Sequence, residues 1–322
     1  MRVLFFISNL GLGGTEKRLY ELVDEIVSSN SNRFDIYVVT SDGEGDFFKR
    51  FQKLKNVNLH LIRKSYLFKI YDINKIIGEF KPDIVHVFTF TAGTYLSIIS
   101  KLHKIKHIIV STGASYISKN YIFSSTVIFL YRYILRFISL YITNSYAGKN
   151  YLIRVGINEK KIVVIQNGLC FKKIKNKPEP NILLKNRKNF LIGSVSNLHD
   201  DKDPLNFIKA CYLLNKKYKY LKFILVGTGY MDQICTNKIN ELGLENSFQL
   251  ITGRDDGPQI SKLFDIAVLS SKAEGFPNVL LEYMYWSKPC VATDVGDCNL
   301  IIDNNVTGYI VESENPKALS KG

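Results

Sequence analysis

The stretch that decides the fold reads SSKAEGFPNVLLEY at residues 270–283, directly after the apolar run IAVL at 266–269. A short, continuous apolar run of this kind is typical of a buried strand. Gly275 and Pro277 then indicate a turn, and proline suits the first position of a helix because its missing N–H would have no partner there. The pattern predicts a strand, a turn and a helix from Asn278 to Trp286 that is apolar on almost every side and therefore buried.

Two carboxylates bracket the start of this predicted helix. Glu274 precedes it and Glu282 lies inside it, where a carboxylate is costly unless a partner awaits it. Glu282 follows Asn278 by one turn, so both side chains face the same way, about 6 Å apart along the axis. Free N–H groups near Asn278, Val279 and Leu280 would form an anion site best suited to phosphate. The alternative is an ordinary loop glutamate followed by a glutamate that a neighbouring side chain satisfies.

The segment from Glu274 to Glu282 has Gly-Phe-Pro-Asn after its first glutamate and seven residues between the two glutamates. It resembles the paired-glutamate signature of the retaining glycosyltransferase family 4. The resemblance implies the GT-B fold of class α/β, in which two Rossmann-like doubly wound parallel-sheet domains face a cleft. It also implies that Glu274, Gly275 and Phe276 lie by the donor, that residues 278–280 bind the nucleotide diphosphate, and that Glu282 binds the ribose hydroxyls.

Length and composition fit a globular protein of two ordinary domains, with 322 residues, 46% hydrophobic and 22% charged. The five cysteines are scattered and lack metal-ligand spacing, which favours reduced thiols in a cytoplasmic protein. The apolar start at residues 3–7 is predicted to be a strand and not a signal peptide, because no cleavage site follows it. The net charge of +14 suggests an anionic partner, and no nucleic-acid-binding motif is present, so a membrane surface is preferred to nucleic acid.

Strand patterns alternate with helix patterns along the whole chain, which predicts parallel sheets with helices on both faces. The strand candidates are residues 3–8, 34–40, 57–62, 84–88, 107–111, 140–143, 161–165, 190–195, 222–226, 248–251, 266–269, 290–293 and 308–311. The helix candidates are residues 15–27, 71–80, 204–214, 231–242, 259–264 and 278–286. In the first helix, Leu19, Leu22, Val23 and Ile26 are expected to form the buried face.

The polar, lysine-rich and proline-containing stretch 169–188 is the predicted linker. It separates a domain at 1–168, which the resemblance assigns to the acceptor, from a nucleotide-sugar-binding domain at 189–322. The family usually continues with further helices, the last of which crosses back to the first domain. The end at Gly322 therefore suggests a truncated product, which would affect stability and activity.

The most hydrophobic stretch of the chain is 121–141, where Arg132 and Arg136 are the charged residues. Two arginines would be costly inside lipid, so a membrane span is disfavoured. A buried crossover helix and a helix lying in the bilayer interface both remain open. The second alternative would place the protein at the inner face of the plasma membrane.

The glycine-rich run from Gly11 to Glu16 follows the first predicted strand and opens a helix. As a dinucleotide fingerprint it is incomplete, because it reads G-x-G-G. By resemblance, Gly13 and Gly14 belong to a loop that faces the diphosphate, since glycine lets the backbone approach a ligand closely. A tight turn with no ligand role is the alternative.

The segment 194–204 follows the first strand of the second domain. By resemblance, Lys202 matches the lysine that binds the diphosphate, and Asn197 replaces the usual arginine. Asp201 and Asp203 flank Lys202 in a D-x-D pattern, which in another glycosyltransferase fold binds a divalent ion. Metal binding is the less favoured interpretation, because such triplets are common by chance.

His86 and Thr112 are expected to end neighbouring strands and to face the cleft, although His86 could equally be a hydrogen-bonded core histidine. Gly227, Gly253 and Arg254 resemble family loops that line the nucleotide. The predicted catalytic residues are thus Glu274, Lys202 and His86. Donor binding is predicted for the other residues of the site, which are Gly13, Gly14, Asn197, Gly227, Gly253, Arg254, Gly275, Phe276, Asn278, Val279, Leu280 and Glu282.

These features predict a retaining glycosyltransferase with neither a metal nor a cofactor. It would move a sugar from a nucleotide-diphosphate sugar, a UDP-sugar before a GDP-sugar, to a glycan or lipid-linked acceptor in cell-surface polysaccharide synthesis. A nucleotide-sugar epimerase and a catalytically silent nucleotide-sugar-binding subunit remain alternatives. The incomplete glycine fingerprint disfavours a nicotinamide oxidoreductase.

Overall fold

A computed structural model describes residues 1–11, 13–30, 33–63, 65–113, 134–169, 189–254 and 256–322. Two compact units are present. The first contains Met1–Gly113, the described residues up to Asn144, and Gly148–Ile165. The second contains Ser145–Ala147 and the described residues of Gln166–Gly322.

The first unit is built on one parallel sheet in the order β3-β2-β1-β4-β5-β6-β7. Its strands are β1 (Arg2–Ile7), β2 (Asp35–Thr40), β3 (Val57–Leu61), β4 (Ile84–Val87), β5 (His107–Thr112), β6 (Leu140–Thr143) and β7 (Ile162–Val164). Every strand predicted for this half is confirmed within one or two residues. The parallel order follows because each connection passes through a helix or a long crossover.

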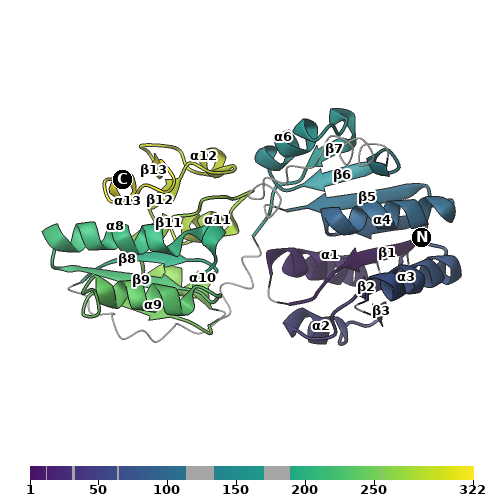
Figure 1. Ribbon diagram of the computed structural model, residues 1–322, viewed down its shortest axis with the longest axis horizontal. Coiled ribbons are helices and arrows are strands. Elements are labelled where there is room, and N and C mark those ends of the chain that lie inside the picture. Colours follow the sequence, from purple (N-terminus) through teal and green to yellow (C-terminus); the bar gives the residue numbers. More distant parts are fainter. Residues whose placement is uncertain (12, 31–32, 64, 114–133, 170–188, 255) are drawn as a thin grey trace. The chain divides into compact units, whose positions relative to one another are not determined.

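The helices of the first unit cover both faces of this sheet. They are α1 (Gly14–Asn30), α2 (Asp46–Phe51), α3 (Tyr66–Phe80), α4 (Phe90–Leu102) and, from Gly148 onward, α6 (Tyr146–Arg154). The crossovers from β1 to β3 run one way along the sheet, and those from β3 to β5 run back. Right-handed crossovers therefore place α1 and α2 on one face and α3 and α4 on the other. Figure 1 shows these helices along the sheet.

Two predictions about the first unit need correction, and three of its helices, α2, α4 and α6, were not predicted. Leu22 was expected in the buried face of α1, but it is exposed, whereas Leu19 and Val23 are fully buried. Helix α3 begins at Tyr66, five residues earlier than predicted. Helix α4 was not predicted, because glycine and β-branched residues weaken its helix pattern. Gly93 is needed there, since a Cβ at that position would lie 2.8 Å from Cγ2 of Val110 on β5.

The second unit repeats the plan with a sheet in the order β10-β9-β8-β11-β12-β13, also parallel throughout. Its strands are β8 (Phe190–Val195), β9 (Leu221–Val226), β10 (Phe248–Ile251), β11 (Ile266–Leu269), β12 (Cys290–Thr293) and β13 (Gly308–Val311). Its helices are α8 (Pro204–Lys217), α9 (Asp232–Glu241), α10 (Gly257–Ile260), α11 (Asn278–Tyr285), α12 (Cys298–Ile301) and α13 (Pro316–Leu319). The short 3₁₀ turns η3 (Asp200–Lys202) and η4 (Ser261–Leu263) complete this unit.

Strand order in the second sheet changes direction between β8 and β11. The chain moves outward from β8 to β10, and then returns to place β11 on the other side of β8. Loops that leave the carboxyl ends of such a strand pair diverge, and ligands of open α/β sheets bind where they do. The loops after β8 and β11 are therefore the ones that position a site.

The predicted domain boundary is close to the observed one. Contacts assign the chain from Gln166 onward to the second unit, three residues before the predicted linker. Most of that linker, and residues 121–133 of the hydrophobic stretch, lie outside the described residues. Cys211, Cys235, Cys290 and Cys298 are free and buried, as thiols of a core would be. Within the described chain, no helix is long and apolar enough to span a membrane.

Candidate functional site

The loop after β8 is held rigidly against the loop after β11. The Oγ of Ser270 donates to the carbonyl oxygens of Lys202 and Asp203, each at 3.1 Å. The N–H of Lys272 donates to the carbonyl of Asp201 at 2.8 Å. Asp203 then adopts a left-handed conformation and caps α8, because its Oδ1 accepts from the N–H of Asn206 at 3.2 Å. These bonds fix the backbone on both sides of Lys202.

This rigid pair of loops brings Lys202 and Glu274 together. The ammonium of Lys202 donates to both carboxylate oxygens of Glu274 at 2.8 Å. Ser271 donates a third hydrogen bond to Glu274, from its Oγ to Oε1 at 2.7 Å. Glu274 is only 6% exposed, so its charge depends on these partners. Both predicted catalytic residues of this unit thus lie at one point, at the carboxyl ends of β8 and β11.

Helix α11 begins at Asn278 as predicted, with Pro277 at its N-cap and no side chain capping it. One part of the predicted anion site is wrong, because the N–H of Leu280 already donates to the carbonyl of Pro277 at 3.2 Å. The N–H groups of Asn278 and Val279 remain as the candidate donors. The helix is also less enclosed than predicted, since Met284 is 46% exposed.

Glu282 is buried on this helix, with 8% of its surface exposed, while Asn278 one turn earlier is half-buried. Tyr283, which follows Glu282 in the sequence, has a structural role. The Tyr283 hydroxyl accepts from the N–H of Val195 at 2.8 Å, at the end of β8, and burial raises its pKa. Helix α11 is thereby anchored to the strand that leads to Lys202, which fixes Glu282 and Lys202 on one framework.

The backbone of Gly275 and Phe276 is also anchored within the second unit. The carbonyl of Gly275 accepts from the N–H of Asp297 at 2.8 Å. The carbonyl of Phe276 accepts from the side-chain amide of Asn167 at 3.1 Å. Both predicted donor-binding residues therefore belong to the fixed turn between Glu274 and α11.

Glycines let the neighbouring loops approach closely. A Cβ at Gly227 would lie 1.7 Å from the carbonyl oxygen of Ser196, so only glycine fits between these two loops. Gly253 has φ of +70° and donates from its N–H to Oγ1 of Thr228 at 3.0 Å. The loops after β8, β9 and β10 are therefore in contact one after another, and their role in lining a nucleotide stays a prediction.

Asn197 and Arg254, two polar residues predicted to bind the donor, differ in whether their side chains already have a partner within the chain. Asn197 is exposed beside the loop that carries Lys202. The guanidinium of Arg254 is already engaged with its neighbour, because its Nε donates to Oδ1 of Asp256 at 2.7 Å. A donor contact through this guanidinium would therefore share it with Asp256.

A stacked ring pair beside Lys202 was not predicted. His199 and Tyr230 stack with centroids 5.0 Å apart and an interplanar angle of 13°. The Tyr230 hydroxyl also accepts from the N–H of Asp200 at 2.9 Å, at the start of η3. Tyr230 thus supports the turn that carries Lys202. The available signal was its place directly after the Gly227-Thr228-Gly229 loop.

In the first unit, Gly13 and Gly14 lie at the start of α1, as predicted. Gly14 is exposed, and a Cβ there would meet nothing within 4 Å. A Cβ at Gly13 would lie 2.0 Å from Oε2 of Glu16, the end of a flexible side chain. Packing therefore does not require glycine at position 14, and the ligand-approach role of both glycines stays a prediction.

His86 is a core residue in the described structure. It lies within β4, is 8% exposed, and its Nε2 is 2.8 Å from the Oγ of Ser111. Its ring packs against Phe5 and Phe88, with centroids 5.6 and 4.4 Å away. Burial lowers the pKa of His86 to about 4, so the ring is neutral near pH 7. This geometry favours the core-histidine alternative over the predicted catalytic role.

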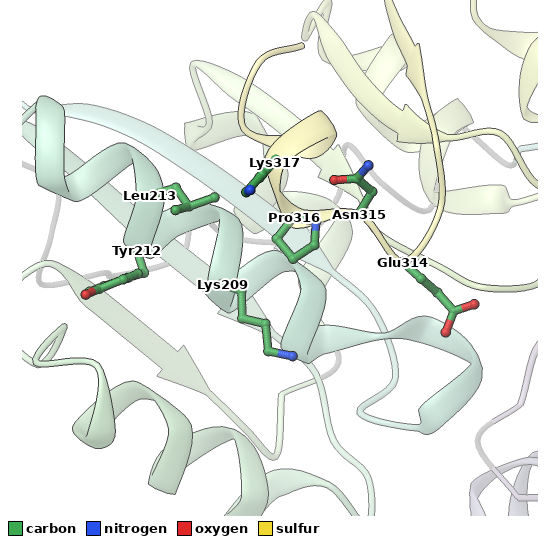
Figure 2. A pocket seen from close by; sticks show the side chains of 7 residues that line it. All are labelled: Lys209, Tyr212, Leu213, Glu314, Asn315, Pro316 and Lys317. Carbon is green, nitrogen blue, oxygen red and sulfur yellow. The ribbon is translucent and has the colours of Figure 1, made fainter.

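A separate pocket of about 340 Å³ lies along α8, and neither Lys202 nor Glu274 lines it. Figure 2 shows Lys209, Tyr212 and Leu213 of α8 on one side and the segment Glu314–Lys317 on the other. This pocket is lined by none of the site residues that were predicted from the sequence.

Two family profiles match this chain in succession. Glycosyltransferase Family 4 matches residues 12–170, and Glycosyl transferases group 1 matches residues 175–322. Together they cover nearly the whole sequence, one for each unit. The protein is a glycosyltransferase. It belongs to the family that these two profiles describe, glycosyltransferase family 4 with its group 1 second domain, as the glutamate signature indicated.

Curated relatives and solved structures agree with this assignment. The chain is 27% identical over 275 residues to an Escherichia coli UDP-Gal:alpha-D-GlcNAc-diphosphoundecaprenol alpha-1,3-galactosyltransferase, with 80% of this chain and 68% of that protein aligned. It is 23% identical to a Campylobacter jejuni N,N'-diacetylbacillosaminyl-diphospho-undecaprenol alpha-1,3-N-acetylgalactosaminyltransferase, with 98% and 87% aligned. Anabaena Alr3699/HepE in complex with UDP and glucose superposes with a TM-score of 0.80 at 22% identity, with 100% and 88% covered. The fold is of the GT-B type, with two Rossmann-like units.

The ion pair predicts a non-additive effect on stability. Lys202→Met should lower the free energy of unfolding by about 3 kcal/mol, because it leaves the buried Glu274 carboxylate without its cation. Once Glu274→Gln has removed that charge, Lys202→Met should cost far less. Urea unfolding of the two single variants and the double variant measures this coupling. Additive losses would show that the two side chains do not interact in solution.

The buried histidine predicts a pH effect. His86 is neutral in the folded chain down to about pH 4, while an unfolded histidine binds a proton near pH 6.5. Stability should therefore fall as pH decreases from 6.5 to 4, by up to about 3 kcal/mol from this residue. His86→Gln, which cannot titrate, should flatten that part of the profile of melting temperature against pH. An unchanged acid slope would contradict the burial of a neutral ring.

Proposed function

We propose that the protein is a retaining glycosyltransferase that moves a sugar from a UDP-sugar to a lipid-linked glycan acceptor in polysaccharide synthesis. The observation that carries this proposal is the convergence of Lys202, Glu274 and the start of α11 at the point where the second sheet changes strand order. Open α/β sheets bind their ligands at such a point. A cation and backbone N–H groups there suit the diphosphate of a sugar nucleotide.

The geometry suggests how the leaving group is stabilised. In the proposed complex, Lys202 exchanges its bonds with Glu274 for bonds with the diphosphate, whose negative charge increases as the sugar bond breaks. The N–H groups of Asn278 and Val279 add fixed dipoles near the same charge. These interactions are stronger in the transition state than in the ground state, which is the condition for catalysis.

Glu274 and Glu282 would then act at opposite ends of the donor. Glu274, released from Lys202 but still bonded to Ser271, would accept from the hydroxyls of the donor sugar. Glu282 would bind the ribose hydroxyls, since it lies one turn into α11. A sugar held in this way becomes oxocarbenium-like as the diphosphate leaves. Retention of configuration requires the acceptor to approach from the face that the diphosphate leaves.

Two relatives support the choice of acceptor and donor. The Escherichia coli and Campylobacter jejuni enzymes are named for diphosphoundecaprenol-linked acceptors, and the first is named for UDP-galactose. Alr3699/HepE has been crystallised with UDP-glucose. An acceptor embedded in a bilayer would also place this protein at the inner face of the membrane, where the stretch 121–141 remains a candidate contact.

We propose that the reaction needs no metal and no cofactor. Asp203 of the D-x-D pattern serves as the N-cap of α8, and burial raises the pKa of its carboxyl, which opposes its use as an exposed metal ligand. Lys202 would supply the positive charge that a metal supplies in other glycosyltransferases.

Glu282 provides the most direct mutational test. Glu282→Gln should lower turnover of a UDP-sugar at least about a hundredfold, since it removes a charged partner of the ribose. The variant should also lose the rise in melting temperature that UDP gives the wild-type protein. Glu312→Gln makes the same chemical change at an exposed site and should match the wild type.

The outcomes of this test also separate the remaining alternatives. Binding of UDP-sugars without any glycosylated product would favour a silent binding subunit. Conversion of the donor sugar without transfer would favour an epimerase. Near-normal turnover in Glu282→Gln would refute the proposed ribose contact.

Chelation tests the proposed independence from metal. Because Lys202 supplies the cationic contact, turnover should persist in excess EDTA. Loss of activity in EDTA, with recovery on addition of manganese, would instead favour a metal held by Asp201 and Asp203.

A further inference from the structure

One side of helix α8 carries lysines and a tyrosine with no acidic residue among them. Residues 204–222, which contain α8 and the turn into β9, include five lysines and neither aspartate nor glutamate. Lys209, Tyr212 and Lys216 are spaced by three and four residues, so they share one side of the helix with Leu213. The helix has 14 residues and is therefore about 21 Å long.

Two further tyrosines follow in the turn between α8 and β9. Tyr218 is 45% exposed and Tyr220 is 59% exposed, and their rings meet edge to face with centroids 6.1 Å apart. Within α8, the Lys216 ammonium lies 4.5 Å from the centroid of the Tyr212 ring. Aromatic rings and ammonium groups therefore alternate along the helix and into the turn. The side chains from Lys209 to Tyr220 that carry them are termed the α8 stripe.

A pocket of about 340 Å³ lies between this stripe and α13, a volume in the range of small-ligand sites. Its far wall is held in place, because Oδ1 of Asn315 accepts from the N–H of Ala318 at 3.0 Å and caps α13. From that wall the side chain of Lys317 points toward Leu213 of α8 (Figure 2). Among the described residues, neither Lys317 nor Lys209 has an ion-pair partner. Two free ammonium groups thus line one preformed pocket.

The acidic residue of this pocket already has a cation of its own. Glu314 lies at the end opposite Tyr212 (Figure 2), and its Oε1 is 3.7 Å from the ammonium of Lys272. Lys272 also donates to Oδ1 of Asp200 at 3.1 Å, in the turn that carries the proposed diphosphate lysine. The free charge along the stripe is therefore positive.

We propose that the α8 stripe and its pocket bind an acidic glycan chain. The ring of a tyrosine offers an apolar face for a sugar ring and a hydroxyl for its polar groups, while ammonium groups form strong hydrogen bonds with sugar carboxylates. Charge complementarity identifies the chain as acidic. A hollow with free ammonium groups on its lining suits a chain with projecting carboxylates better than a flat bilayer.

The position of α8 suits a chain that extends away from the site of transfer. The helix begins at Asp203, beside Lys202, and returns to the opposite edge of the parallel sheet, where β9 starts. This role rests on the proposed function, and it identifies the glycan of that reaction as an acidic one. Binding to the stripe itself requires no turnover and is measured separately.

Calorimetric titration of the whole chain tests the proposal with three matched probes. Hexagalacturonate has sugar rings and carboxylates, maltohexaose has the rings alone, and hexaglutamate has the carboxylates alone. We expect hexagalacturonate to bind at least tenfold more tightly than either of the others. Equal binding of hexaglutamate would show attraction by charge alone, and equal binding of maltohexaose would show a neutral-glycan site. Either result, or the absence of hexagalacturonate binding, would overturn the proposal.

The rise in melting temperature with UDP, measured on the same protein, keeps this inference separate from the proposed function. A rise with UDP but no binding of hexagalacturonate would refute the α8 stripe alone. Binding of hexagalacturonate without any rise would support the stripe and refute the proposed donor site.

Variants locate the contact. Tyr218→Ser combined with Tyr220→Ser should weaken hexagalacturonate binding at least tenfold, and so should Lys209→Gln combined with Lys216→Gln. Lys53→Gln combined with Lys55→Gln makes the same change in net charge at exposed positions of the first unit and should bind like the wild type. All three variants should keep the wild-type melting temperature within a few degrees, because the replaced side chains are exposed. Wild-type affinity in both stripe variants, or an equal loss in the Lys53 and Lys55 pair, would refute the site.

Discussion

The hydrogen-bonded ion pair between Lys202 and Glu274 is the interaction on which the site depends. A carboxylate that is 6% exposed is costly to bury without close partners, and here it has an ammonium on both oxygens and a hydroxyl on one. The two residues are brought together only because β8 and β11 are neighbours in the sheet. The ion pair can therefore form only in this strand order, and it lies at the carboxyl ends of both strands, where the site is.

The surrounding loops keep that pair in place. Ser270 and Lys272 bind the backbone on either side of Lys202, Tyr230 supports the turn before it, and Tyr283 ties α11 to β8. Several of these contacts are with backbone groups, so they restrict the loops and not merely the side chains. A preorganised site of this kind has less reorganisation to undergo when charge develops on a leaving diphosphate.

The sequence predicted the sheets well and the contacts of single polar residues less well. Strands such as β8 and β11 are short, continuous apolar runs, and their alternation with helices allows only a few topologies. Lys202 and Glu274 were both recognised as site residues, but their pairing depends on how two loops 72 residues apart in the chain lie in space. Helix α4 was missed because its helix pattern is interrupted at Gly93, which only contact with Val110 explains. The burial of His86 could not be predicted for a similar reason. A strand pattern does not show that Phe5 and Phe88 pack against the ring of His86.

The most direct test of the central claim is a crystal structure of the protein with bound UDP. The expected result is a diphosphate at the start of α11, with the Lys202 ammonium moved from Glu274 to a phosphate oxygen and the ribose hydroxyls on Glu282. A nucleotide bound elsewhere, or one bound while Lys202 and Glu274 keep their present contacts, would contradict it.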